Sequence, residues 1–99
     1  MRFGIPRNCT IGGATYTIRR SNLLEDNNMY GLTDHTKSTI TLDSKLTEDL
    51  LQRTFIHEAI HQMDVVYDTH LRESQIKRLA YGVAELVKQL EVSNVRNKD

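Results

Sequence analysis

The chain has very little cysteine and proline, the residues that form disulfides and that break helices. Its 99 residues include one cysteine, Cys9, one proline, Pro6, and no tryptophan. A single cysteine cannot form an internal disulfide, so a scaffold held together by disulfides within the chain is excluded. Because Pro6 is the only proline, nothing of that kind breaks a helix in the rest of the chain.

The chain also lacks an excess of charge of either sign and any long apolar run. Lys and Arg together number 13, and so do Asp and Glu. No basic block predicts a nucleic-acid partner, and no stretch approaches the roughly 20 apolar residues that a membrane span needs. Residues 1–7 do not have the apolar run of a signal peptide. We therefore expect a cytoplasmic protein with neither a membrane nor a nucleic-acid partner.

The first half of the chain has the pattern of antiparallel β structure. Gly12-Gly13 is a two-residue hairpin signal between two strand-like segments. A second hairpin is predicted further on, after a polar loop over residues 21–28. The predicted strands are residues 9–11, 14–18, 29–33 and 39–42. Together they predict a small N-terminal sheet.

The second half of the chain is predicted to be helical. Thr47 is a suitable N-cap for a first helix that continues to about residue 66. A second helix, over about residues 72–91, has apolar residues at helical spacing, centred on Val83. The predicted fold class is therefore α+β, with antiparallel hairpins packed on two long C-terminal helices. We expect one domain over residues 1–92 and a disordered tail over 93–99.

The most informative segment is His57-Glu58-Ala59-Ile60-His61, which reads H-E-x-x-H. On a helix, residues four apart project from nearly the same face, so His57 and His61 can bind one Zn²⁺. Glu58 lies beside them, where it can take a proton from a zinc-bound water. The flanking residues are largely apolar, as expected of a helix that packs into a core with one polar side facing a metal.

A catalytic zinc site usually has a third protein ligand. The candidates that follow His61 are Asp64, Asp68, His70, Glu73 and Glu85. Asp64 lies on the same helix as the histidines, so we expect it to orient an imidazole rather than bind the metal. Helical phase places Glu73 at the edge of the buried face and Glu85 on the solvent face. Geometry therefore favours Glu73 as the third ligand, and His70 is the main rival.

The run from Thr54 to Met63, followed by the Glu73–Ala80 segment, resembles small zinc metallopeptidases of the gluzincin type. The resemblance is nearest to the compact phage and prophage proteins called minigluzincins, which are related to antirepressor-cleaving and SprT-like peptidases. It covers most of residues 8–92 and implies a minimal zincin-like core. It further implies that His57, His61 and Glu73 bind zinc, that Glu58 is the general base, and that the location is the cytoplasm of a bacterium or of a phage-infected host cell.

The resulting hypothesis is a zinc-dependent metallopeptidase that acts on a peptide or protein substrate. If residues 39–42 form an edge strand, they could pair with an extended peptide. An oxyanion donor is also needed. Four residues could supply it, namely Tyr67, Tyr81, His35 and His70, although packing is the expected role of Tyr81 and solvent exposure that of His35. The alternative function is a zinc-stabilised binding or regulatory module of phage origin with no or vestigial hydrolytic activity, and a metal-free scaffold is a third hypothesis.

Overall fold

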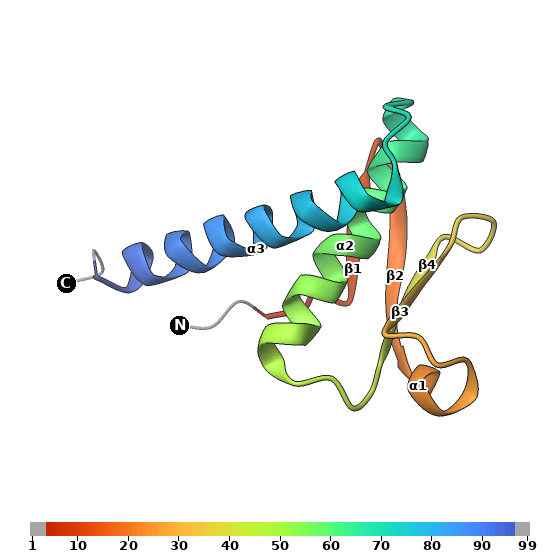
Figure 1. Cartoon of the computed structure of the whole chain (residues 1–99), viewed down its shortest axis with the longest axis horizontal. Coiled ribbons are helices and arrows are strands. Elements are labelled where there is room, and N and C mark those ends of the chain that lie inside the picture. Colours follow the sequence, from red (N-terminus) through yellow and green to blue (C-terminus); the bar gives the residue numbers. More distant parts are fainter. Residues whose placement is uncertain (1–3, 97–99) are drawn as a thin grey trace.

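The protein is a four-stranded N-terminal sheet packed against two long C-terminal helices, as a computed structural model shows (Figure 1). The structure describes residues 4–96, with side chains through Glu91. In chain order the elements are β1 (Asn8–Ile11), β2 (Ala14–Ser21), α1 (Leu23–Asp26), β3 (Gly31–Asp34), β4 (Thr39–Asp43), α2 (Glu48–Tyr67) and α3 (Glu73–Arg96). The α+β class predicted from the sequence is confirmed.

The sheet is mixed rather than purely antiparallel. Both predicted hairpins form, β1 with β2 and β3 with β4. They join through a parallel pairing of β2 with β4, which sets Ile18 beside Ile40, so the strand order is β1-β2-β4-β3. Strand β4 therefore lies inside the sheet, so residues 39–42 do not meet the condition of an edge strand under which they could pair with a peptide. Of the two edge strands, β1 and β3, the one with more contacts to the histidine helix is β3, so unpaired backbone groups of β3 lie near that helix.

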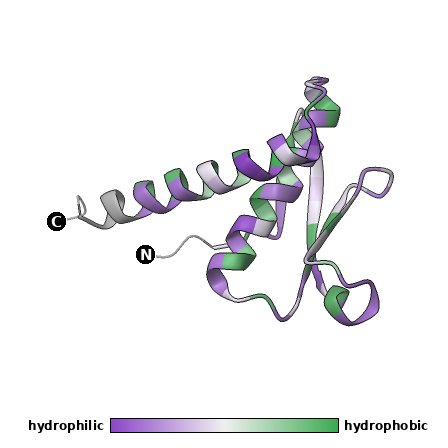
Figure 2. Ribbon diagram, in the orientation of Figure 1, coloured by the Kyte–Doolittle hydropathy of each residue, from purple (hydrophilic) through white to green (hydrophobic). Residues whose placement is uncertain are grey.

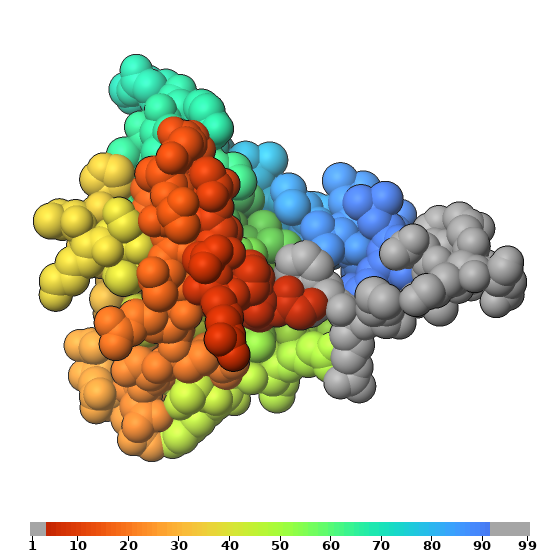
Figure 3. All heavy atoms as spheres, turned by 180° about the vertical axis from the view of Figure 1, so that it is seen from behind, coloured from red at the N-terminus to blue at the C-terminus, as the bar shows by residue number. Residues whose placement is uncertain are grey.

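The core lies between the sheet and helix α2. Tyr16, Ile40 and Leu42 are fully buried on the sheet side, and Phe55 and Ile60 face them from α2. Both long helices alternate apolar and polar bands along their length (Figure 2), as amphipathic helices do when one side is covered. Seen from behind, residues of β1 and β2 form the middle of the face, with residues of the other elements visible around them (Figure 3).

A short helix replaces part of the loop predicted over residues 21–28. Helix α1 buries Leu23, and the Asp43 carboxylate accepts hydrogen bonds from the backbone N–H groups of Leu24, at 2.8 Å, and Lys45, at 2.9 Å. These donors, that of Leu24 above all, lower the pKa of Asp43 below its ordinary value. The carboxylate thus ties α1 to the end of the central strand.

Helix α3 is buried only along a narrow strip. Ile76 and Ala80 are each 2% exposed, whereas Val83, on which the predicted apolar face is centred, is 37% exposed. The prediction was wrong in phase, because the covered strip lies to one side of the apolar arc and much of α3 extends away from the sheet and α2 (Figure 1). The helix continues through Arg96, so residues 93–96 are helical rather than part of the predicted tail, and residues 97–99 lie outside the described residues.

The described part of the chain contains no helix that has both the length and the apolar composition required to cross a membrane.

Candidate metal centre

Helix α2 presents His57 and His61 side by side. The two imidazole rings stack with their centroids 4.9 Å apart and their planes at 19°. This arrangement follows from the sequence alone, because residues four apart on a helix lie on one face. The side chains are 25% and 37% exposed, so the rings are partly sheltered yet reachable from solvent.

Glu73 reaches both histidines from the first residue of α3. Its two carboxylate oxygens lie 2.9 Å from His57 Nε2 and 2.8 Å from His61 Nε2. The short connection between α2 and α3 turns the chain back, so that the start of α3 lies beside the last half of α2 (Figure 1). The structure thus brings together the three residues that helical phase and the family resemblance selected.

The three side chains fit a zinc ion. Their candidate ligand atoms all lie within 4.8 Å of one another. Ligand atoms at about 2.0–2.1 Å from zinc in a tetrahedron are about 3.3 Å apart, so the Glu73 contacts would open by roughly half an ångström. Two imidazoles and one carboxylate are a ligand set that zinc accepts in catalytic sites, and they leave a fourth position free.

The connection between α2 and α3 is held by Asp64, whose hydrogen bonds within the described residues go to the turn and not to His57 or His61. Its carboxylate accepts hydrogen bonds from the Thr69 hydroxyl and, at 2.8 Å, from the Leu71 N–H. These bonds, first that of Thr69, lower the pKa of Asp64. The expectation that Asp64 orients an imidazole is therefore wrong. Its position at the end of α2 instead lets it satisfy donors of the turn that brings Glu73 into place.

The other candidate ligands lie away from the histidines. His70 is exposed and pairs with Asp68 at 2.9 Å, within the turn itself. The backbone φ angles of His70 and Asp68 are positive, at 56° and 54°, which is typical of a tight turn. Neither side chain belongs to the group that His57 and His61 form with Glu73. Glu85 is exposed, in agreement with the solvent face predicted for it.

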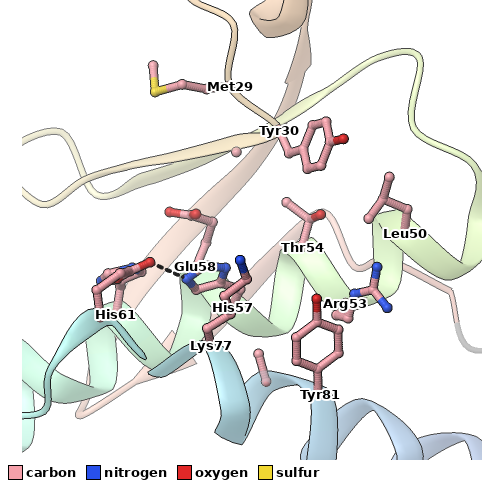
Figure 4. Close-up of a pocket in the computed structure, with 13 residues that line it drawn as sticks. Met29, Tyr30, Leu50, Arg53, Thr54, His57, Glu58, His61, Lys77 and Tyr81 are labelled. Atoms are coloured by element: carbon pink, nitrogen blue, oxygen red, sulfur yellow. Dashed lines mark hydrogen bonds and ion pairs between the residues drawn. The ribbon is translucent and has the colours of Figure 1, made fainter. Parts of the chain in front are cut away.

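Glu58 is half-buried and stands apart from the three candidate ligands. Its carboxylate points from α2 towards the strand above (Figure 4), where the Thr33 hydroxyl donates a hydrogen bond to Oε1 at 2.7 Å. Space for this contact depends on Gly31. A Cβ atom at Gly31 would lie 3.0 Å from Glu58 Cγ and 2.9 Å from Thr54 Cγ2. The Glu58 side chain, which comes from α2, is therefore held in place by strand β3.

A cavity of about 380 Å³ extends from the histidines towards the N-terminal part of α2. Its walls include Tyr30, Arg53 and Tyr81 (Figure 4). A second cavity, of about 460 Å³, lies towards the other end of α2. Both cavities are lined by Gly31, Glu58, His61 and Glu73. The group of His57, His61 and Glu73, called the histidine group below, thus lies between two cavities, which gives an extended ligand room on either side.

The structure separates the four residues considered as oxyanion donors. Tyr81 lines the first cavity and His35 the second, whereas Tyr67 and His70 line neither. His35 is exposed, as expected, and its Nδ1 accepts a hydrogen bond of 2.6 Å from the amide of the buried Gln62. Tyr81 packs against the Arg53 guanidinium, 4.6 Å from ring centroid to carbon, which agrees with its expected packing role.

Sequence reasoning missed the residues that surround the histidine group. Thr33 and Gly31 come from a strand whose position depends on the sheet, so no local pattern identifies them. Arg53 and Lys77 carried a usable signal, because each lies four positions along a helix from a candidate ligand, His57 and Glu73 respectively.

In comparisons with known proteins, no family model, no curated protein and no solved structure matches this chain.

Proposed function

We propose that this protein is a zinc-dependent metallopeptidase. The observation that carries the proposal is the arrangement of four side chains, three placed to bind a metal and one beside them. His57, His61 and Glu73 converge on one point, and Glu58 lies beside them without joining the group. A purely structural zinc site has no use for a second carboxylate outside its ligand set, whereas a hydrolytic site needs one as general base.

Each of these residues has a definite part in the proposed reaction. His57, His61 and Glu73 would hold the zinc ion, which would supply Lewis acidity towards a water molecule and the scissile carbonyl. Glu58 would accept the proton of the attacking water and pass it to the leaving amine. The Thr33 hydroxyl would keep the Glu58 carboxylate turned towards the cavity, through the hydrogen bond it already makes.

Strand β3 gives the substrate a place to bind. Within the four-stranded sheet, β3 pairs with β4 along one edge, and its other edge borders the cavities that contain Glu58. An extended peptide can add to such an edge through backbone hydrogen bonds. We therefore propose that a peptide or protein in the cytoplasm is the substrate and that it lies along β3 across the histidine group.

The decisive experiment is Glu58→Gln. This variant should retain stoichiometric zinc but lose peptide hydrolysis by about 10²- to 10⁴-fold, since general-base catalysis contributes that much. Glu85→Gln, on the exposed side of α3, is the matched control and should change neither property. Full activity of the Glu58→Gln protein, or wild-type protein without bound zinc, would refute the proposal.

A second candidate function is a zinc-stabilised binding or regulatory module without hydrolysis. The exposed apolar residues of α3, Leu79, Leu86 and Leu90, favour it, because they form a surface on which another protein could pack. The two functions differ in what Glu58→Gln does to biological activity. A binding module would keep its effect in that variant, and a peptidase would lose it.

A further inference from the structure

Two cationic side chains line the first cavity one helical turn from the candidate metal ligands. Arg53 lies four positions before His57 on α2, and Lys77 lies four positions after Glu73 on α3. Figure 4 shows Lys77 reaching up from α3 beside His57, while Arg53 and Tyr81 face each other further along the two helices. The candidate metal ligands thus line one end of the cavity, and the positively charged side chains of Arg53 and Lys77 line the part next to it.

Neither cation is neutralised by a carboxylate of the described residues. Arg53 makes its contact with the face of the Tyr81 ring, at 4.6 Å, which orients the guanidinium and leaves its N–H groups free. Lys77 has no ion pair in the described chain, unlike Lys88, whose Nζ lies 3.0 Å from Asp49.

The cavity would become positive once a metal ion is bound. The two carboxylates that line it are already engaged, Glu58 with Thr33 and Glu73 with the imidazoles. Two cations and two carboxylates cancel, so a bound divalent zinc ion would leave the cavity positive. An anionic group in the ligand would complement that charge, and the planar donors of an arginine suit a carboxylate in particular.

From these observations we propose that the cavity binds a carboxylate of the substrate, one or two residues from the scissile bond. This inference rests on the proposed peptidase function. One helical turn is about 5.4 Å long, and an extended peptide advances about 3.3 Å per residue. A carboxylate held by Arg53 and Lys77 would thus belong to a residue one or two positions from the cleaved bond, as an Asp or Glu side chain or as a C-terminal carboxylate.

Matched peptides test the proposal. One pair differs by Glu against Gln at each position flanking the cleaved bond, and a second pair differs by a C-terminal acid against an amide. Both binding and hydrolysis are measured, binding with zinc-loaded Glu58→Gln protein so that no substrate is consumed. We expect the carboxylate peptide of at least one pair to bind about tenfold more tightly than its partner, as one charge-assisted hydrogen bond would give. The pair that responds identifies the source of the carboxylate.

Variants assign the preference to its residues. Arg53→Gln and Lys77→Gln should each reduce the preference, and Arg53→Lys should retain part of it, which separates loss of charge from loss of folding. Arg78→Gln is the matched control, because Arg78 adjoins Lys77 on α3, is exposed and does not line the cavity. All variants are checked by thermal melting.

The outcomes separate this inference from the proposed function. Equal binding of acidic and neutral peptides would overturn the carboxylate site, even if both are cleaved, and so would a preference that survives in both Gln variants. Selective binding that depends on Arg53, in a protein that cleaves none of the peptides, would support the carboxylate site and count against the peptidase.

Discussion

The close approach of strand β3 to helix α2 predicts that Gly31→Ala destabilises the protein. An added Cβ would lie 2.9 Å from Thr54 Cγ2, 3.0 Å from Glu58 Cγ and 3.3 Å from Glu58 Oε2. Thr54 is buried, so its methyl group has little room to move. The backbone conformation of Gly31 allows alanine, because Gly31 is not among the residues with positive φ. The cost therefore comes from packing alone.

The expected magnitude is a balance of two effects. Overpacking of this kind costs about 1–3 kcal/mol, and replacing glycine by alanine returns about 0.4–1 kcal/mol by restricting the unfolded chain. A net loss of about 1–2 kcal/mol remains, which for a domain of this size lowers the melting temperature by roughly 4–16 °C. Relief of the clash requires either the strand to move away from Glu58 or the Glu58 side chain to shift, so we also expect hydrolysis to fall.

Thermal and denaturant melts of Gly31→Ala beside Gly82→Ala measure this balance. Gly82 lies within helix α3, and a Cβ there would meet nothing within 4 Å. Alanine should therefore stabilise that helix by about 0.8–1 kcal/mol. Two identical substitutions should thus have opposite signs, and only the surroundings of the two glycines account for the difference.

A double variant tests the cause. Thr54→Ser removes the methyl group that the new Cβ would meet first, so it should restore part of the stability of Gly31→Ala, although alone it costs some packing. Gly31→Ala as stable as the wild-type protein would refute the close packing of β3 on α2. The same conclusion would follow if the two substitutions were strictly additive.

Three further predictions concern the site and its supports. Glu73→Ala should lose zinc, measured by elemental analysis, whereas Glu85→Ala should retain it, and chelation should lower the melting temperature only where zinc was bound. Thr33→Val should keep zinc but lower the turnover rate by about tenfold, since one hydrogen bond to Glu58 is lost; an unchanged rate would exclude the positioning role. The pKa of Asp64 is lowered on folding, so its contribution to stability is present above about pH 4 and is lost as the pH falls through the folded pKa. Asp64→Asn should accordingly be less stable at pH 7 and show a weaker acid dependence of melting, and an unaltered acid dependence would argue against that contribution.

Local chain geometry was predictable, and packing was not. The hairpin at Gly12-Gly13 follows from a turn preference that acts over a few residues. Helix α2 begins after Thr47, as predicted, although the Thr47 side chain makes no capping hydrogen bond. The sequence left open which strand lies at the edge, because strand order depends on the parallel pairing of β2 with β4, which crosses a long connection. The buried side of α3 differs from the one predicted around Val83 for a similar reason. The apolar pattern of α3 does not say which of its apolar residues α2 covers and which remain in solvent.

By itself, the sequence determined that His57 and His61 share one face of a helix, because helical spacing is a property of the backbone. It also determined that Glu58 lies beside them on the same turn. Only the tertiary structure decided that Glu73 returns to meet both imidazoles and that Thr33 reaches Glu58 from the edge of the sheet. Those contacts join residues from different elements, and their distances depend on how the helices and the sheet pack rather than on any spacing along the chain.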